Sequence, residues 1–240
     1  MDGSTSATNA VRHRLGLGRL LPLGGPRDGA WIAEEAANGV LRAAVREVPG
    51  VRLGVLRLAP ADPGNAEEPV VPPPPSGLPP GALRVTADFA AAPARPLPAT
   101  ADLVRRALAT AAARRLGLTV TEVDLRVTDL LDGDEPAPEP AAPPAAAPAG
   151  PSLTGEEALA AEAARSVPGV TGLTGALGRA VHLESVEDPA VAALPHRHAR
   201  VEITVGADHR AVDVARRVRA AVGRALPDHP TVAVLVTGVS

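Results

Sequence analysis

The tetrapeptide VPGV occurs twice in this chain, at residues 48–51 and 167–170, and each copy ends a stretch with helical periodicity. Over residues 32–48, apolar side chains recur every four positions, which predicts an amphipathic helix. The stretch before the second copy begins with a capping-box pattern at Thr154 and Glu157. Because proline cannot continue the helical hydrogen bonds, each VPGV predicts the end of a helix.

The segments that follow each VPGV also have the same order. LRVTADF and RVEITV alternate apolar and polar residues, which predicts strands with one solvated face. A further helix and a last strand follow in both halves. These matching segments lie at residues 83–89, 100–116 and 122–130 in the first half, and at 200–205, 211–226 and 231–239 in the second. The order predicts two tandem copies of one small unit.

Each unit is expected to be an α+β layer of helix, strand, a further strand or hairpin, helix and strand, with both helices on one face of a mixed sheet. The predicted organisation is a flexible lead over 1–28, a first unit over 29–131, a proline/alanine linker over 132–151 and a second unit over 152–240. A proline-rich insert at 60–81 is expected to be a mobile surface loop. The two units are expected to fold independently.

Composition limits the classes of function. The chain has one Trp, one Phe and no Cys, so its core must be built from aliphatic residues, and disulfides and thiolate chemistry are excluded. A net charge of -3 argues against a general nucleic-acid binder. All basic side chains apart from histidine are arginine, which is typical of a GC-rich, actinobacterial genome. The N-terminal residues contain no apolar run long enough for a signal peptide or a membrane span, so a cytoplasmic protein is expected.

Three kinds of chemical site can be weighed from the sequence. Four of the five histidines in the second half suggest a metal site, namely His182, His196, His198 and His209. The favoured interpretation is that the pair at His196 and His198 lies where a proline-containing loop enters a strand. The glycines of TGLTGALG at 171–178 are interpreted as a hairpin turn. No nucleophile, base and orienting acid come together. The prediction is a protein without catalytic, metal or cofactor-binding residues.

Two surfaces are candidates for binding. Arginines on the second helix of each half predict a basic face that docks on an anionic surface or acidic partner, or else a solvated face paired with acidic neighbours. They are Arg105, Arg106, Arg114, Arg115, Arg216, Arg217, Arg219 and Arg224. The alternation of the strands predicts a bare sheet face for self-association. Its residues are Arg84, Thr86, Asp88, Asp124, Arg126, Thr128, Glu202 and Thr204.

The two halves resemble the alkaline shock protein family of Gram-positive bacteria. The resemblance rests on VPGV, LRVTADF, DLVRRALATAAARRLGL and VTEVDLRVTDL. The whole chain also resembles actinobacterial proteins filed under a nucleopolyhedrovirus family name. The first resemblance implies a non-catalytic, self-associating cytoplasmic protein of envelope or general stress, held at the membrane in some cases by a small anchored partner. The alternative is a nucleic-acid or anionic-ligand binding module that uses the arginine helices. Nucleic acid is disfavoured, because stacking aromatics are scarce.

Overall fold

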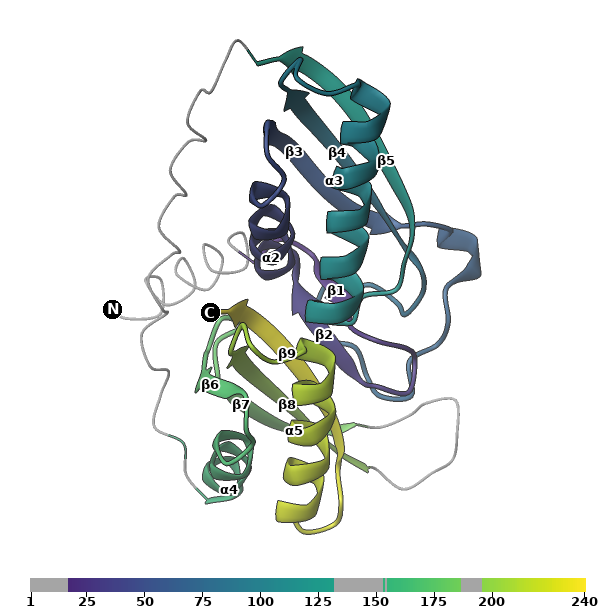
Figure 1. Cartoon of the computed structure of the whole chain (residues 1–240). Coiled ribbons are helices and arrows are strands. Elements are labelled where there is room, and N and C mark those ends of the chain that lie inside the picture. The colour runs from purple at the N-terminus through teal and green to yellow at the C-terminus, as the bar shows by residue number, and fades with distance from the viewer. Residues whose placement is uncertain (1–16, 132–152, 154, 187–195) are drawn as a thin grey trace, which may run out of the picture.

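The computed structural model describes residues 17–131, 153, 155–186 and 196–240, which form an α+β fold with two mixed sheets (Figure 1). The helices are α2 (Glu34–Arg46), α3 (Leu97–Ala111), α4 (Gly155–Arg165) and α5 (Ala211–Ala225), with a 3-10 turn η1 (Pro63–Asn65) and a π-helical turn η2 (Ala112–Leu116). None of the helices in these ranges is long and apolar enough to cross a membrane.

The small sheet has the strand order β3-β4-β5, and its strands are β3 (Val51–Pro60), β4 (Leu83–Ala91) and β5 (Val120–Leu130). β3 is antiparallel to β4, whereas β5 is parallel to β4. The alternation predicted for β4 is confirmed: Val85, Ala87 and Phe89 are buried in the core that also holds the apolar sides of α2 and α3. Both helices lie on one side of this sheet (Figure 1).

The large sheet has the strand order β1-β2-β9-β8, after which β6 and β7 both pair with the remaining edge of β8. Its strands are β1 (Leu20–Pro22), β2 (Ala30–Ala33), β6 (Val170–Leu173), β7 (Val181–Val186), β8 (His196–Val205) and β9 (Thr231–Val239). β9 is parallel to both β8 and β2. Valines of β8 and β9 pack beneath α4 and α5, so this sheet is also covered by helices on one face (Figure 1).

The first two strands differ from expectation. Residues 20–22 were expected in a flexible lead and Ile32 in a helix, yet β1 and β2 form a hairpin whose second strand pairs with β9. All four residues of β2 are buried, so this strand lacks the alternation that would have predicted it. The helix begins only at Glu34, where two acidic residues occupy its first turn. Strands from residues 20–33 therefore complete the sheet of the second half.

The two halves share one core. Buried apolar side chains of both sheets and all four helices belong to a single hydrophobic cluster. At the junction, η2 meets the start of α5: Arg210 Nε donates to the carbonyl oxygen of Ala113 at 3.0 Å. Gly117, at φ 93°, lies so close to α5 that a Cβ there would be 2.2 Å from Val212 Cγ1. This shared core does not support the expectation that each half folds independently.

The proline-rich insert packs against the protein over much of its length. The indole Nε1 of Trp31 donates to the Leu78 carbonyl oxygen at 3.0 Å, and the Leu78 amide donates to Leu20 at 2.8 Å. Val71 of the insert joins Trp31 and Leu235 in a second buried apolar cluster. A mobile loop was expected here, but the insert covers the β1, β2 and β9 part of the sheet face that points away from the helices. Its prolines restrict the backbone and so lower the entropy lost on docking.

A second correction concerns the glycine-rich segment 171–178. A hairpin turn was expected there, but β6 and β7 do not pair with each other. They follow one another along β8, and residues 174–180 leave the sheet between them. Backbone hydrogen bonds from the Thr174 amide to the Glu202 carbonyl (3.1 Å) and from the Glu202 amide to the Ala180 carbonyl (2.8 Å) hold both ends of this excursion. The excursion therefore folds directly over Glu202.

Candidate interaction surfaces

The outer face of the small sheet is solvent-accessible and carries charges of both signs. Arg84 Nε lies 2.6 Å from Glu122 Oε2 and 3.6 Å from Asp124 Oδ2, which joins the adjacent strands β4 and β5. Thr86, Asp124, Arg126 and Thr128 are exposed, whereas Arg84 and Asp88 are half-buried. The six residues predicted for self-association on this sheet therefore lie together on one accessible face.

β5 is the edge strand of this sheet. It pairs only with β4 in the described part of the chain, so its other edge has unpaired backbone groups. Val127 and Leu130, which face the helix side, retain 38% and 55% of their accessible surface, whereas the apolar residues of β4 with this orientation are buried. Arg126 has no ion-pair partner within the residues that the structure describes. The strand thus combines a free edge, exposed apolar groups and an unpaired charge.

The equivalent face of the large sheet is covered, so the prediction that Glu202 lies on a bare face is wrong. Glu202 is fully buried, and both of its carboxylate oxygens accept from the Leu177 amide at 3.2 Å. Burial raises the pKa of Glu202 to about 7, against the opposing effects of the amide hydrogen bonds and of Arg200 at 3.9 Å. Thr204 is half-buried and accepts a hydrogen bond from Thr171 at 2.9 Å.

Two of the histidines weighed as metal ligands contact neighbouring side chains of the large sheet. His198 is buried on β8, where its Nδ1 lies 2.8 Å from Thr231 Oγ1 on β9. Burial lowers the pKa of His198 to about 4. His182 faces Glu184 on β7 at 3.6 Å. Within the described ranges, no group of three or more His, Asp or Glu side chains is arranged to hold a metal ion.

Half of the eight arginines predicted to bind a partner interact within the chain. Arg216 forms two hydrogen bonds with Asp28, at 2.7 and 2.9 Å, which lower the pKa of that carboxyl group. Arg219 donates to the carbonyl oxygen of Arg27, so these two arginines fasten the β1–β2 turn to α5. Arg105 pairs with Asp102 on its own helix, and Arg217 donates to a backbone carbonyl of α5. Arg105 and Arg216 match the alternative interpretation of a helix face paired with acidic neighbours, whereas Arg217 and Arg219 donate to backbone carbonyls.

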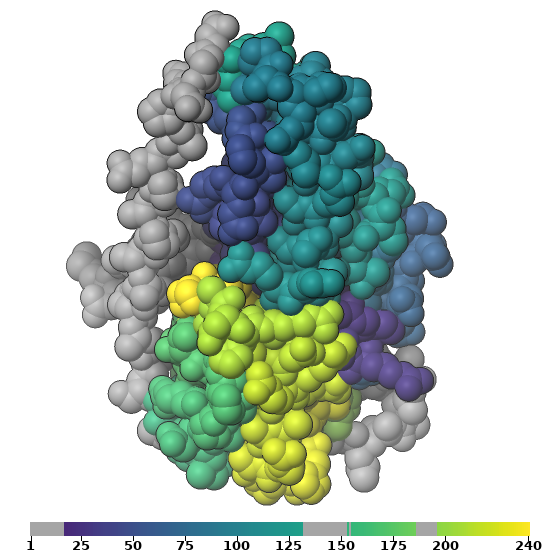
Figure 2. Space-filling view, in the orientation of Figure 1, coloured from purple at the N-terminus to yellow at the C-terminus, as the bar shows by residue number. Residues whose placement is uncertain are grey.

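The other four arginines have no ion pair within the described residues. We call Arg106, Arg114, Arg115 and Arg224 the arginine face. Arg106 and Arg114 are exposed on α3 and η2, and Arg224 is exposed on the last turn of α5. α3 and α5 follow one another along the same side of the molecule, and both are accessible there (Figure 2). These four arginines are therefore distributed over both halves of the chain.

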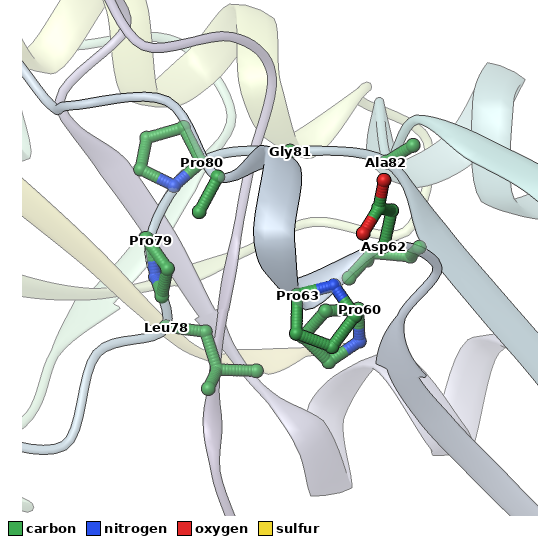
Figure 3. Close-up of a pocket in the computed structure, with 10 residues that line it drawn as sticks. Pro60, Asp62, Pro63, Leu78, Pro79, Pro80, Gly81 and Ala82 are labelled. Atoms are coloured by element: carbon green, nitrogen blue, oxygen red, sulfur yellow. The ribbon is translucent and has the colours of Figure 1, made fainter.

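A pocket of about 230 Å³ lies within the proline-rich insert and is lined by Pro60, Pro63, Leu78, Pro79 and Pro80 among others (Figure 3). Its one acidic side chain, Asp62, accepts a hydrogen bond from the Gly64 amide at 3.0 Å and thereby caps η1. Small-molecule sites combine an apolar wall with several convergent polar groups. This pocket has the wall but only one such group, already engaged in its own turn.

The buried carboxyl of Glu202 is the feature that sequence reasoning missed. Alternation placed it outward, next to solvent, because a polar residue in a strand usually faces water. The available signal was the glycine-rich segment opposite it, which departs from strand periodicity.

Comparison with known proteins finds no protein-family model that matches the chain and no curated protein that matches it by sequence.

Proposed function

We propose that the chain contains two copies of one alkaline-shock-like unit and acts as a non-catalytic interaction or scaffold protein in envelope or general stress. The strand pairing supports the repeat. In the first half β4 pairs antiparallel with β3 and parallel with β5. In the second half β8 pairs antiparallel with β6 and β7 and parallel with β9. In both halves one helix precedes these strands, and another lies between the two parallel ones.

The observation that carries the function is the separation of two accessible charged surfaces. The outer face and free edge of the small sheet carry both signs of charge, which suits association with another copy of the same surface. The arginine face supplies four positive charges that have no ion pair within the described residues, which suits an acidic protein partner. A protein that self-associates through one surface and binds a partner through the other is a scaffold. We propose a cytoplasmic location, peripheral to the membrane where the acidic partner is membrane-anchored.

A matched pair of variants tests the arginine face. Arg106→Glu with Arg114→Glu reverses two exposed charges of this face, and Arg46→Glu with Arg165→Glu makes the same charge change at the exposed ends of α2 and α4. Each variant is used as bait against cytoplasmic and membrane fractions of the native cell. We expect one acidic protein to be retained by the wild type and the control and lost from the first variant. Equal retention by both variants would contradict the proposal.

The alternative function is binding of nucleic acid through the same arginines. Such binding depends on counterion release, so retention of a short RNA would fall steeply between 50 and 200 mM salt, roughly in proportion to the number of phosphates contacted. We expect no retention at physiological salt, since the chain offers one Trp and one Phe, both buried, for base stacking. Salt-dependent retention that is lost in Arg106→Glu with Arg114→Glu would favour the alternative.

A further inference from the structure

We propose that two copies of the chain form a dimer by antiparallel pairing of β5 with its counterpart, with Leu125 at the two-fold axis. The proposal deepens the self-association assigned above and rests on it. Pairing would join two three-stranded sheets into one of six strands and would satisfy the backbone groups along the free edge of β5. The partner is a second copy because the charges and the apolar residues of β5 complement themselves, as the next steps show.

The two-fold symmetry restricts the possible registers. In an antiparallel pair the local two-fold axes pass through pairs of opposed residues, so one residue of β5 must face its own copy, and opposed side chains lie on the same face of the sheet. Centring the pair on Asp124 opposes two carboxylates at the axis. Centring it on Arg126 opposes two guanidinium groups. Both arrangements place like charges directly opposite each other, which is destabilising.

Centring the pair on Leu125 removes this conflict on the outer face. Asp124 then lies opposite Arg126 of the second copy, and the symmetry repeats the contact, so two cross-strand ion pairs form. Asp124 is largely exposed, with a side chain 63% accessible and only a 3.6 Å contact to Arg84. Arg126 has no ion-pair partner in the described part of the chain. Asp124 of each copy thus supplies a partner for the unpaired Arg126 of the other.

The same register matches the apolar residues on the helix side. Val127 lies opposite Val123 of the second copy, and Leu130 lies opposite Val120. Val120 and Val123 are partly buried against the core of their own copy, whereas Val127 and Leu130 are the exposed apolar residues of the strand. Pairing would therefore extend each core across the seam. The charges on one face and the apolar residues on the other are both compatible with this register.

Charge exchange within β5 tests this arrangement, with sedimentation velocity as the measure of dimerisation and circular dichroism as the check on folding. In Asp124→Arg the new arginine of each copy faces Arg126 of the other copy, so two pairs of like charges form. In Arg126→Asp the new carboxylate of each copy faces Asp124 of the other in the same way. Each variant should therefore weaken dimerisation by at least roughly tenfold. The double variant Asp124→Arg with Arg126→Asp restores both opposed pairs and should regain the wild-type affinity. Glu47→Arg, an equal charge change at the exposed end of α2, should leave the dimer unchanged.

Two results would overturn the proposal. A wild-type protein that stays monomeric at all concentrations would contradict both the dimer and the proposed self-association. A wild-type dimer that the single variants do not weaken, or that the double variant does not restore, would contradict this register while leaving self-association intact. Capture of a partner through the arginine face is measured separately and is affected by neither result. Protection of β5 amides from hydrogen exchange that increases with protein concentration is the expected independent sign of the pairing.

Discussion

At the scale of single residues, two side chains of β8 titrate in opposite senses. The pKa of Glu202 is about 7 in the folded protein, above its ordinary value, so its contribution to the free energy of unfolding is complete below pH 4.5 and is lost as the pH rises through 7. The pKa of His198 is about 4, below its ordinary value, so its contribution is complete above pH 6.5 and is lost as the pH falls through 4. The two effects oppose each other over the shared range.

Substitution separates the two effects. In Glu202→Gln only the histidine effect remains of the two, so we expect the free energy of unfolding of this variant to rise from pH 4.5 to 7. The difference in the free energy of unfolding, variant minus wild type, should be about 1–3 kcal/mol more positive above pH 7 than at pH 4.5. His198→Gln should show the reverse slope. Urea unfolding of the three proteins at matched pH values measures both. If wild type and Glu202→Gln have parallel profiles, the carboxyl group ionises normally and the assignment fails.

Gly117 provides a second test at this scale. Its positive φ is unfavourable for an L-residue with a side chain, and a Cβ would meet Val212, so Gly117→Ala must both strain the backbone and push η2 away from α5. We expect a loss of about 2–4 kcal/mol in stability. Gly39→Ala, in the middle of α2 with open space around the new methyl group, should instead be neutral or stabilising. Equal effects of both substitutions on thermal unfolding would contradict the close packing at Gly117.

At the scale of elements, Trp31 links β2 to the proline-rich insert. Trp31→Ala removes the largest side chain of the second cluster and the donor to the Leu78 carbonyl, so we expect a cost of about 3–5 kcal/mol. Trp31→Phe keeps most of the apolar contact and should cost less, about 1–2 kcal/mol. Hydrogen exchange over residues 70–81 should accelerate strongly in the alanine variant and mildly in the phenylalanine variant. Unchanged exchange in the alanine variant would show that the insert docks without the indole.

The elements also show which features could be predicted from the sequence. β4, α3 and α5 bury one side and leave the other accessible to water, so their periods are visible in the residues. β2 is buried on both sides and has no such period. The docking of the insert and the burial of Glu202 depend on what lies opposite in space, which no local pattern records.

At the scale of the whole molecule, the shared core predicts the outcome of cutting the chain within 141–147, a segment outside the described residues. The two pieces should remain associated, because β2 pairs with β9 through backbone hydrogen bonds and not through the linker. A separate 152–240 fragment should lose most of its structure, since it lacks β1, β2 and the insert. Adding the 1–131 fragment should restore the circular dichroism of the intact chain. A well-folded 152–240 fragment would instead support independent units.

The pairing of β2 with β9 has a consequence for synthesis. Trp31 lies opposite Leu235, so β2 must wait for a strand that lies far later in the sequence to leave the ribosome. Closing such a long loop is slow compared with forming local helices. Until then the nascent chain exposes an indole and an unpaired strand, which are features that chaperones bind. A chain that stops after β8 would keep them exposed permanently and should be removed by proteolysis.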